Sequence, residues 1–152
     1  MEKKYKLISA GKKTNSNGIT VYRIESLRDF EDIKKGNKGG YIENEQNLSH
    51  NGNAWVSDNA RVYGNAMVHG NARVSDNAWV YGNAWVSENA RVYGNAWVSG
   101  NAMVHGNAMV YGNVWVTGNA WVTENARVSD NAWVIGDTMV DEYRKIKKNK
   151  GI

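Results

Sequence analysis

The sequence predicts a mainly β protein whose central part is a parallel β-helix, a coil of short strands that stack turn upon turn. From residue 53 to residue 142 the chain divides without insertion into fifteen hexads of the form N-A-x-V-x-[G/D/E]. Val fills its position in all fifteen hexads, Asn opens fourteen of them, and Ala follows in thirteen. The chain has no proline and sixteen glycines, which indicates regularly placed turns. So strict a repeat predicts a repeat architecture.

The alternation within each hexad assigns its residues to two faces. In A-x-V-x, Ala and Val share one face of a short strand, and the two variable residues share the other. The remaining two residues, such as Gly-Asn, stand where the chain bends, because Gly accepts a positive φ freely and Asn tolerates it better than most residues. A coil in which each hexad forms one side keeps Ala and Val inside at every turn. The variable letter therefore faces outward.

These hexads resemble those of the left-handed parallel β-helix proteins, the hexapeptide-repeat family of acyltransferases and γ-class carbonic anhydrases. The family repeat has an aliphatic residue and a small residue four positions later, as Val92 and Ala96 stand here. The resemblance implies left-handed winding and three hexads per turn, hence about five turns over residues 51–142. The segment YRIESLRDFEDIKKGNKGGYIENEQNLSHNGNAWV, residues 22–56, resembles the leader of small hexapeptide-repeat proteins common in phages, prophages and bacteria.

The two ends of such a coil expose unpaired strands and need caps. Residues 1–50 are expected to form the first cap. Within them YKLI and ITVYRI predict a β-hairpin, and SLRDFEDIKKG, residues 26–36, predicts a short helix. The basic tail, residues 143–152, has a helical charge pattern and is expected to cover the far end or to fray.

The composition excludes several classes of protein. The chain of 152 residues has no Cys, so it has neither a disulfide framework nor a thiolate site. No segment approaches the ~20 apolar residues of a membrane span, and we expect a cytoplasmic protein with no membrane partner and no cofactor. The net charge of +4 belongs to the ends, because residues 53–142 carry four Arg, eight acids and no Lys. Nucleic acid is therefore not the expected partner.

Stacking the hexads at eighteen residues per turn sorts the outward residues into three columns, one for each side of the coil. The first side holds positions 55, 73, 91, 109 and 127, the second 61, 79, 97, 115 and 133, and the third 67, 85, 103, 121 and 139. All seven Trp of the chain are expected to point away from the core. The second side is the most aromatic, and its candidate interface residues are Trp79, Trp97, Trp115, Trp133, Tyr63, Tyr81 and Ile135.

Exposed apolar patches of this kind usually mark an interface, and Trp and Tyr are enriched at binding hot spots. We therefore expect a rigid, non-enzymatic interaction module that self-associates through the aromatic stripe. The family resemblance favours a homotrimer, and a dimer fits the residues equally well. The phage-like leader adds a host or viral protein as a further expected partner. Two alternatives stay open: stacked Trp that stabilise only their own column, partly under the cap, by ~0.2–1 kcal/mol per pair, or a sugar or other flat ligand.

The first side offers a second face, for an anionic partner such as a phosphate backbone. Its candidate residues are Arg73, Arg91, Arg127 and Tyr93. Like charges one strand apart repel, so nearby anions are expected. The corner carboxylates that follow on this side could instead neutralise the Arg residues from within the chain; they are Asp58, Asp76 and Asp130.

The sequence gives little support for a catalytic site or a metal site. His69 and His105 share the third side but stand two turns apart, about 10 Å by strand spacing, so they cannot bind one zinc ion. No metal site and no catalytic residue is therefore assigned. An acyltransferase-like enzyme with a site at a subunit junction stays open as an alternative, with His105 or His69 as the candidate base.

Overall fold

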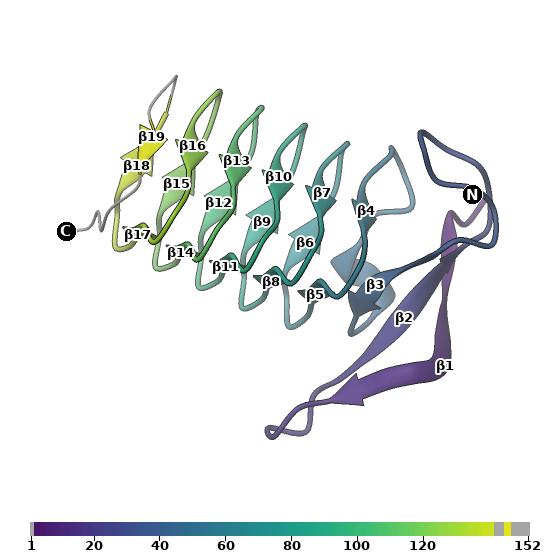
Figure 1. Ribbon diagram of the computed structural model, residues 1–152. Helices are drawn as coiled ribbons and strands as arrows, with labels where there is room; N and C mark the ends of the chain where they lie inside the picture. The colour runs from purple at the N-terminus through teal and green to yellow at the C-terminus, as the bar shows by residue number, and fades with distance from the viewer. Residues whose placement is uncertain (1, 142–144, 147–152) are drawn as a thin grey trace.

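The computed structural model describes residues 2–141 and 145–146 (Figure 1). The protein is mainly β, and its central part is a parallel β-solenoid of about six turns, each built from three short sides. The coil runs as one straight stack, with the N-terminal hairpin projecting from its first turn (Figure 1). The predicted fold class is confirmed, with one turn more than the hexads alone supply.

Each hexad contributes a strand of two residues, the outward residue and Val, followed by a corner. The hexad strands are β4 (Trp55–Val56), β5 (Arg61–Val62), β6 (Met67–Val68), β7 (Arg73–Val74), β8 (Trp79–Val80), β9 (Trp85–Val86), β10 (Arg91–Val92), β11 (Trp97–Val98), β12 (Met103–Val104), β13 (Met109–Val110), β14 (Trp115–Val116), β15 (Trp121–Val122), β16 (Arg127–Val128), β17 (Trp133–Val134) and β18 (Met139–Val140). Every third strand joins the same parallel sheet.

The register confirms the predicted turn length. Trp97 pairs with Trp79 on one neighbouring strand and with Trp115 on the other, so equivalent residues lie eighteen positions apart. The first side is the sheet β4-β7-β10-β13-β16-β19, the third side is β6-β9-β12-β15-β18, and the second side is the run β3-β5-β8-β11-β14-β17. Each rung donates its backbone N–H groups to the carbonyls of the next turn, as Trp97 N does to Val114 O at 2.8 Å.

The core is the column of inward Ala and Val residues. Every hexad Val from Val56 to Val134 is fully buried, and so is every hexad Ala. Burying a Val side chain contributes roughly 1.5–3 kcal/mol, and the fixed small residues keep the coil uniform in width. The assignment of Ala and Val to the inside is therefore confirmed.

The corners differ from the expectation in the role of Asn. The residue with positive φ is the one before Asn, such as Gly100 with φ +67° or Asp76 with φ +58°, and no Asn of the described chain has a positive φ. Asn instead forms ladders along the corners, in which each amide nitrogen donates to the amide oxygen one turn further on. The ladder that starts at Asn65 and ends at Asp137 has N–O distances of 3.1–3.2 Å. Asn is fixed because its own copy lies above and below it.

The N-terminal cap extends the second-side sheet. β1 (Tyr5–Thr14) and β2 (Thr20–Ser26) pair antiparallel, where the sequence predicts a hairpin. β3 (Lys38–Ile42) pairs antiparallel with β2 and parallel with β5. The coil therefore begins with β3, earlier than the expected boundary after residue 50, and Leu48 completes this first turn by bridging to Val68.

The predicted helix over residues 26–36 is wrong. These residues form an irregular loop in which Phe30 and Ile33 exchange backbone hydrogen bonds of 2.8 and 2.9 Å and bury their side chains. At the other end of the coil, β19 (Lys145–Ile146) of the basic tail is a strand that pairs parallel with β16. The other tail residues lie outside the described chain. Among the described residues the one helix is a 3₁₀ turn, η1 (Glu45–Asn47), capped by Asn44.

Candidate interaction surfaces

The second side carries a continuous stack of four indoles. The ring centroids of Trp79, Trp97, Trp115 and Trp133 follow one another at 5.1, 5.4 and 5.2 Å, with interplanar angles of 8° or less. Tyr63 and Tyr81 stack beside them in the same way, with their centroids 5.1 Å apart. Ile135 lies half-buried at the far end of that second row. The predicted stripe thus forms one ordered surface.

The stacking decides which part of each indole is available. Parallel rings with centroids about 5 Å apart overlap face to face in an offset stack, so each inner indole has both faces covered. What reaches the surface is the ring edge, and Trp115 and Trp133 are each 41% exposed. A sugar or base needs a free face on which to stack, so this geometry disfavours the flat-ligand alternative.

Cationic side chains extend the indole stack of the second side toward the N-terminal cap. The Arg61 guanidinium lies 5.1 Å above the centroid of Trp79, which begins the stack. One strand further, Tyr41 is buried between its neighbours, with Arg23 and Lys13 each 5.2 Å from its ring. The Arg23 Nη1 also donates to the Tyr41 hydroxyl at 3.0 Å. The second side is therefore cationic at the cap end and purely apolar at the other.

The corners of the second side carry glycine. The corner after each second-side strand is a glycine with positive φ; these are Gly64, Gly82, Gly100, Gly118 and Gly136. A shallow hollow of about 200 Å³ opens on the stack itself, lined by Tyr81, Trp97, Ser99, Trp115 and Thr117. The surface is accessible to a broad partner.

One Trp departs from the expected exposure. Trp55, at the start of the first side, is 1% exposed, because the cap covers it. The Phe30 ring meets it edge-on with centroids 5.3 Å apart, and the Tyr5 ring does so at 6.3 Å. The expectation that all seven Trp face solvent is wrong for this one, and the cap covers the first side where the sequence suggested cover over the second.

The first-side Arg residues are arranged differently from the expectation. Arg73 Nη2 donates to Asp32 of the cap loop at 2.7 Å, and this hydrogen bond lowers the pKa of Asp32. Two of the corner carboxylates expected to neutralise the Arg residues accept backbone N–H groups instead: Asp58 accepts from Asp76 at 3.2 Å, and Asp76 accepts from Gly94 at 3.0 Å. Arg91 lines a hollow of about 240 Å³ together with Arg73, Ser75, Asp76, Tyr93 and Met109.

The other first-side candidates stand further along the coil. Tyr93 stacks on Tyr111 with centroids 5.0 Å apart, and partial burial raises its pKa. Arg127 lies on β16 next to Met109, exposed to solvent. Three of the four candidate residues, Arg73, Arg91 and Tyr93, therefore line one hollow, and Met109 separates Arg127 from Arg91.

The two His residues of the third side are each held against the indole of the next rung. The His69 ring lies edge-on to Trp85 at 5.6 Å, and the His105 ring lies edge-on to Trp121 at 6.1 Å. His105 Nδ1 is also 3.6 Å from a carboxylate oxygen of Glu88. These contacts place both His residues beside an apolar surface and leave them on separate rungs.

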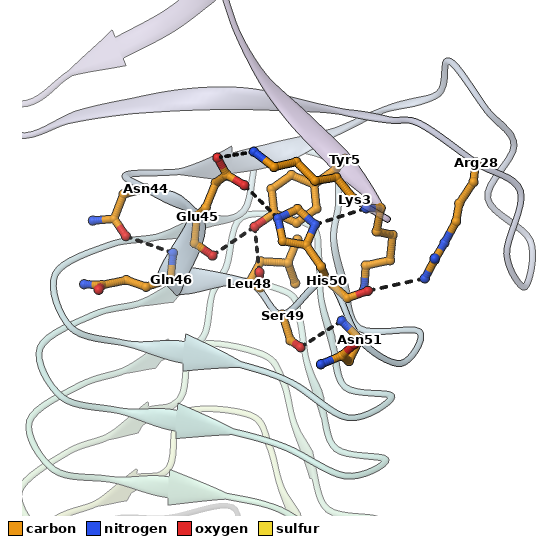
Figure 2. A network of polar contacts seen from close by, with 11 residues as sticks. Lys3, Tyr5, Arg28, Asn44, Glu45, Gln46, Leu48, Ser49, His50 and Asn51 are labelled. Atoms are coloured by element: carbon orange, nitrogen blue, oxygen red, sulfur yellow. Dashed lines mark hydrogen bonds and ion pairs between the residues drawn. The ribbon is translucent and has the colours of Figure 1, made fainter. Parts of the chain in front are cut away.

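Sequence reasoning missed a polar cluster that joins the cap to the first turn (Figure 2). His50 Nδ1 accepts the backbone N–H of Lys4 at 3.0 Å, and its Nε2 lies 2.7 Å from Glu45 Oε1. The imidazole stacks on Tyr5 at 4.1 Å, and the Tyr5 hydroxyl donates to Leu48 O at 2.6 Å. Burial raises the pKa of Tyr5 strongly. Both His50 ring nitrogens are thus engaged, and their contacts tie the cap to the first turn.

Lys4 completes this attachment from inside. Its side chain is fully buried, and Nζ donates to Ala54 O at 2.6 Å and to Gly52 O at 3.3 Å. These carbonyls belong to the first rung of the first side, which has no preceding rung to pair with. Burial, with Arg28 and Arg73 nearby, lowers the Lys4 pKa to about 8. No spacing in the sequence connects Lys4 with residues fifty positions away.

In the part of the chain that the structure describes, no helix is long and apolar enough to cross a membrane. The same residues contain no group of three or more His, Cys, Asp or Glu side chains that could hold a metal ion.

The stacked turns and their outward columns define the chain as a β-helix repeat protein. A family model described as the YdcK beta solenoid repeat matches it in five overlapping segments, residues 54–70, 60–75, 72–88, 84–100 and 90–106. Together the segments span residues 54–106, about a third of the chain. No curated protein matches the chain. Membership of the acyltransferase family and a phage origin stay predictions.

Proposed function

We propose that this protein is a rigid, non-enzymatic interaction module that self-associates through its second side. The observation that carries the proposal is the stack of four indoles on consecutive rungs, whose edges stay exposed along five hexads without acids. The five second-side hexads contain one Arg and no Asp or Glu. Two such sides can therefore approach without like-charged carboxylates meeting, and Trp is the residue most enriched at interface hot spots.

The distribution of charge along the second side favours a dimer over a trimer. In a trimer around an axis parallel to the coils, the cap ends of all three subunits lie at the same level, so the three Arg61 side chains gather there. In an antiparallel dimer, Arg61 of one subunit lies toward the apolar end of its partner, near the level of Trp133 and Ile135. The antiparallel arrangement avoids the repulsion, and we prefer it to the trimer that the family resemblance implies.

An enzyme is the weaker alternative on the same observations. Family acyltransferases build acceptor sites from loops that interrupt the coil, and this coil has no insertion from residue 53 to residue 142. The candidate base His105 faces Trp121 and Glu88. Saturable acyl-CoA binding that is lost in His105→Ala would revive this alternative.

The decisive experiment is the solution mass of the full chain by light scattering on a sizing column. A subunit has a mass of 17.0 kDa, so a dimer, a trimer and a monomer are well separated. Trp115→Asp places a charge in the middle of the stripe and is expected to yield a monomer. Trp121→Asp is the matched control, since Trp121 has the same hexad position and is 42% exposed, against 41% for Trp115, but lies on the third side.

The expected result is an oligomer for the wild type and for Trp121→Asp, and a folded monomer for Trp115→Asp. A wild-type monomer at the highest soluble concentration would contradict self-association. An oligomer that survives Trp115→Asp would place the interface elsewhere. Far-UV circular dichroism of each variant shows whether the coil is intact.

A further inference from the structure

The charges of the coil are sorted by side, which no single hexad reveals. The five third-side hexads contain five acids and no Lys or Arg, whereas the first-side hexads contain three of each sign. Glu88 and Glu124 occupy corners of the third side, and Asp137 and Asp141 lie on its last described rung. The third side is therefore the acidic side of the protein.

The third side is also the most exposed apolar surface. Of the six large apolar side chains exposed in the described chain, four lie there: Met67, Trp85, Trp121 and Met139, at 38–53% exposure. Met103 pairs with Trp85 on one strand and Trp121 on the other, so the two indoles are separated by a thioether. Unlike the second-side indoles, they do not stack on one another.

Indoles flanked by carboxylates recognise cations. A Lys ammonium or Arg guanidinium gains from a cation–π contact with Trp and from an ion pair with a nearby carboxylate. At the N-terminal end of this side, a carboxylate already binds a cation of the chain, because Lys3 Nζ lies 3.2 Å from Glu45 Oε2. Glu45 borders a hollow of about 390 Å³ that continues onto the third side and is lined also by His50, Met67, His69 and Trp85.

The same charges argue against a second copy of this surface as the occupant. Two third sides brought together would oppose carboxylates at every second rung, and opposed like charges are destabilising. Nucleic acid and anionic lipid are repelled for the same reason. An occupant complementary to both the negative charge and the apolar column carries Lys or Arg together with aliphatic side chains.

We infer that the third side is a docking surface for a basic, aliphatic-rich segment of a partner protein, distinct from the self-association surface on the second side. The segment lies along the column from the Glu45 hollow toward Asp141. Its aliphatic side chains contact the exposed Met and Trp residues, and its cationic groups reach the corner carboxylates. This inference stands independently of the proposed self-association.

The test uses a fluorescein-labelled peptide of about a dozen alternating Lys and Leu residues, titrated with the full chain and followed by anisotropy at low salt. A peptide with Glu in place of Lys is the probe control. The double variant Glu88→Gly, Glu124→Gly removes two charges and converts both corners to the residue found at Gly70 and Gly106 on alternate rungs of the same side. It is expected to weaken binding about fivefold or more.

The matched control is Asp76→Gly with Asp130→Gly, which removes the same charge at corners of equally positive φ on the first side. It is expected to leave the affinity unchanged, as is Trp115→Ser, whereas Trp121→Ser should weaken binding. Failure of the Lys-Leu peptide to bind at low salt would overturn the inference. So would equal weakening by both Gly pairs, or equal binding of the Glu peptide. A solution mass that falls in Trp121→Asp would show this side to be a self-association face instead.

Discussion

The stacked indoles on the second side should be energetically coupled, and the coupling can be isolated with a double-mutant cycle. We would compare Trp97→Ala, Trp115→Ala and the double variant. The two rings are parallel within 2°, with centroids 5.4 Å apart. A pair in this geometry contributes ~0.5–1.5 kcal/mol beyond its buried area. The double variant should therefore lose about 1 kcal/mol less of the free energy of unfolding than the sum of the losses in the two single variants.

The third side supplies a matched cycle that should show less coupling. Trp85 and Trp121 occupy the same hexad position, but Met103 lies between them, so they are two strands or about 10 Å apart. The two indoles do not stack on one another and share only Met103 as a neighbour, so their coupling should be smaller than that of Trp97 with Trp115. The contrast between the two cycles measures stacking separately from the burial of an indole.

The assay is urea unfolding followed by far-UV circular dichroism, since the substitutions remove Trp fluorescence. Each variant is measured at two or more protein concentrations, because a stability that depends on association changes with concentration while an intrachain coupling does not. Equal coupling in both cycles, or none in the Trp97–Trp115 cycle, would refute the stacking argument. A coupling that appears only at high concentration would assign it to self-association.

Two further predictions concern the cap and the corners. Lys4 has a folded-state pKa of about 8 against 10.5 for the free side chain, so the unfolded chain binds more protons between these pH values. The free energy of unfolding should therefore rise by up to ~3 kcal/mol from pH 8 toward 10.5. Urea titrations should show that this rise is lost in Lys4→Met. A rise of the same size in the variant would rule out Lys4 as its source. Gly100→Ala should lower the free energy of unfolding by ~2 kcal/mol or more, since its Cβ would lie 2.9 Å from Gly118 N at a residue with φ +67°. Gly18→Ala, at a residue with φ +84° and open space around it, should lower the free energy of unfolding by only ~1 kcal/mol. Equal shifts of the urea midpoint would contradict the close approach of the turns.

The sequence predicts the coil well because its rules are local and repeat. Alternation places Val and Ala inside, and a turn of eighteen residues then aligns every outward column, so the register of Trp97 with Trp115 could be predicted without any long-range information. The cap follows no such period. Trp55 has the same hexad context as Trp97, yet it is buried by a loop that begins almost thirty residues before it. Its burial depends on contacts that no periodicity encodes.

The fixed Asn of the hexads indicates an amide ladder, whereas the sequence pattern alone assigns it to the bend. Asn looked like a residue chosen for the bend, whereas the bend is made by the residue before it, even where that residue is Asp76 or Glu88. The useful observation was that Asn recurs at every eighteenth position, because identical amides stacked one turn apart can each donate to the next. The amide N–O distances along these ladders are 3.1–3.4 Å, which side-chain amides repeated at the ~4.8 Å strand spacing can reach.

The separation between core and surface residues lets one coil carry different surfaces at no cost to its fold. Because every outward position alternates with a buried Ala or Val, the identity of the outward residue hardly affects the packing inside. The second side gathers Trp without acids, and the third side gathers Trp and Met with acids, although both share the same inner column. The sorting of five of the eight coil acids onto one side supports the proposal that the second and third sides bind different partners.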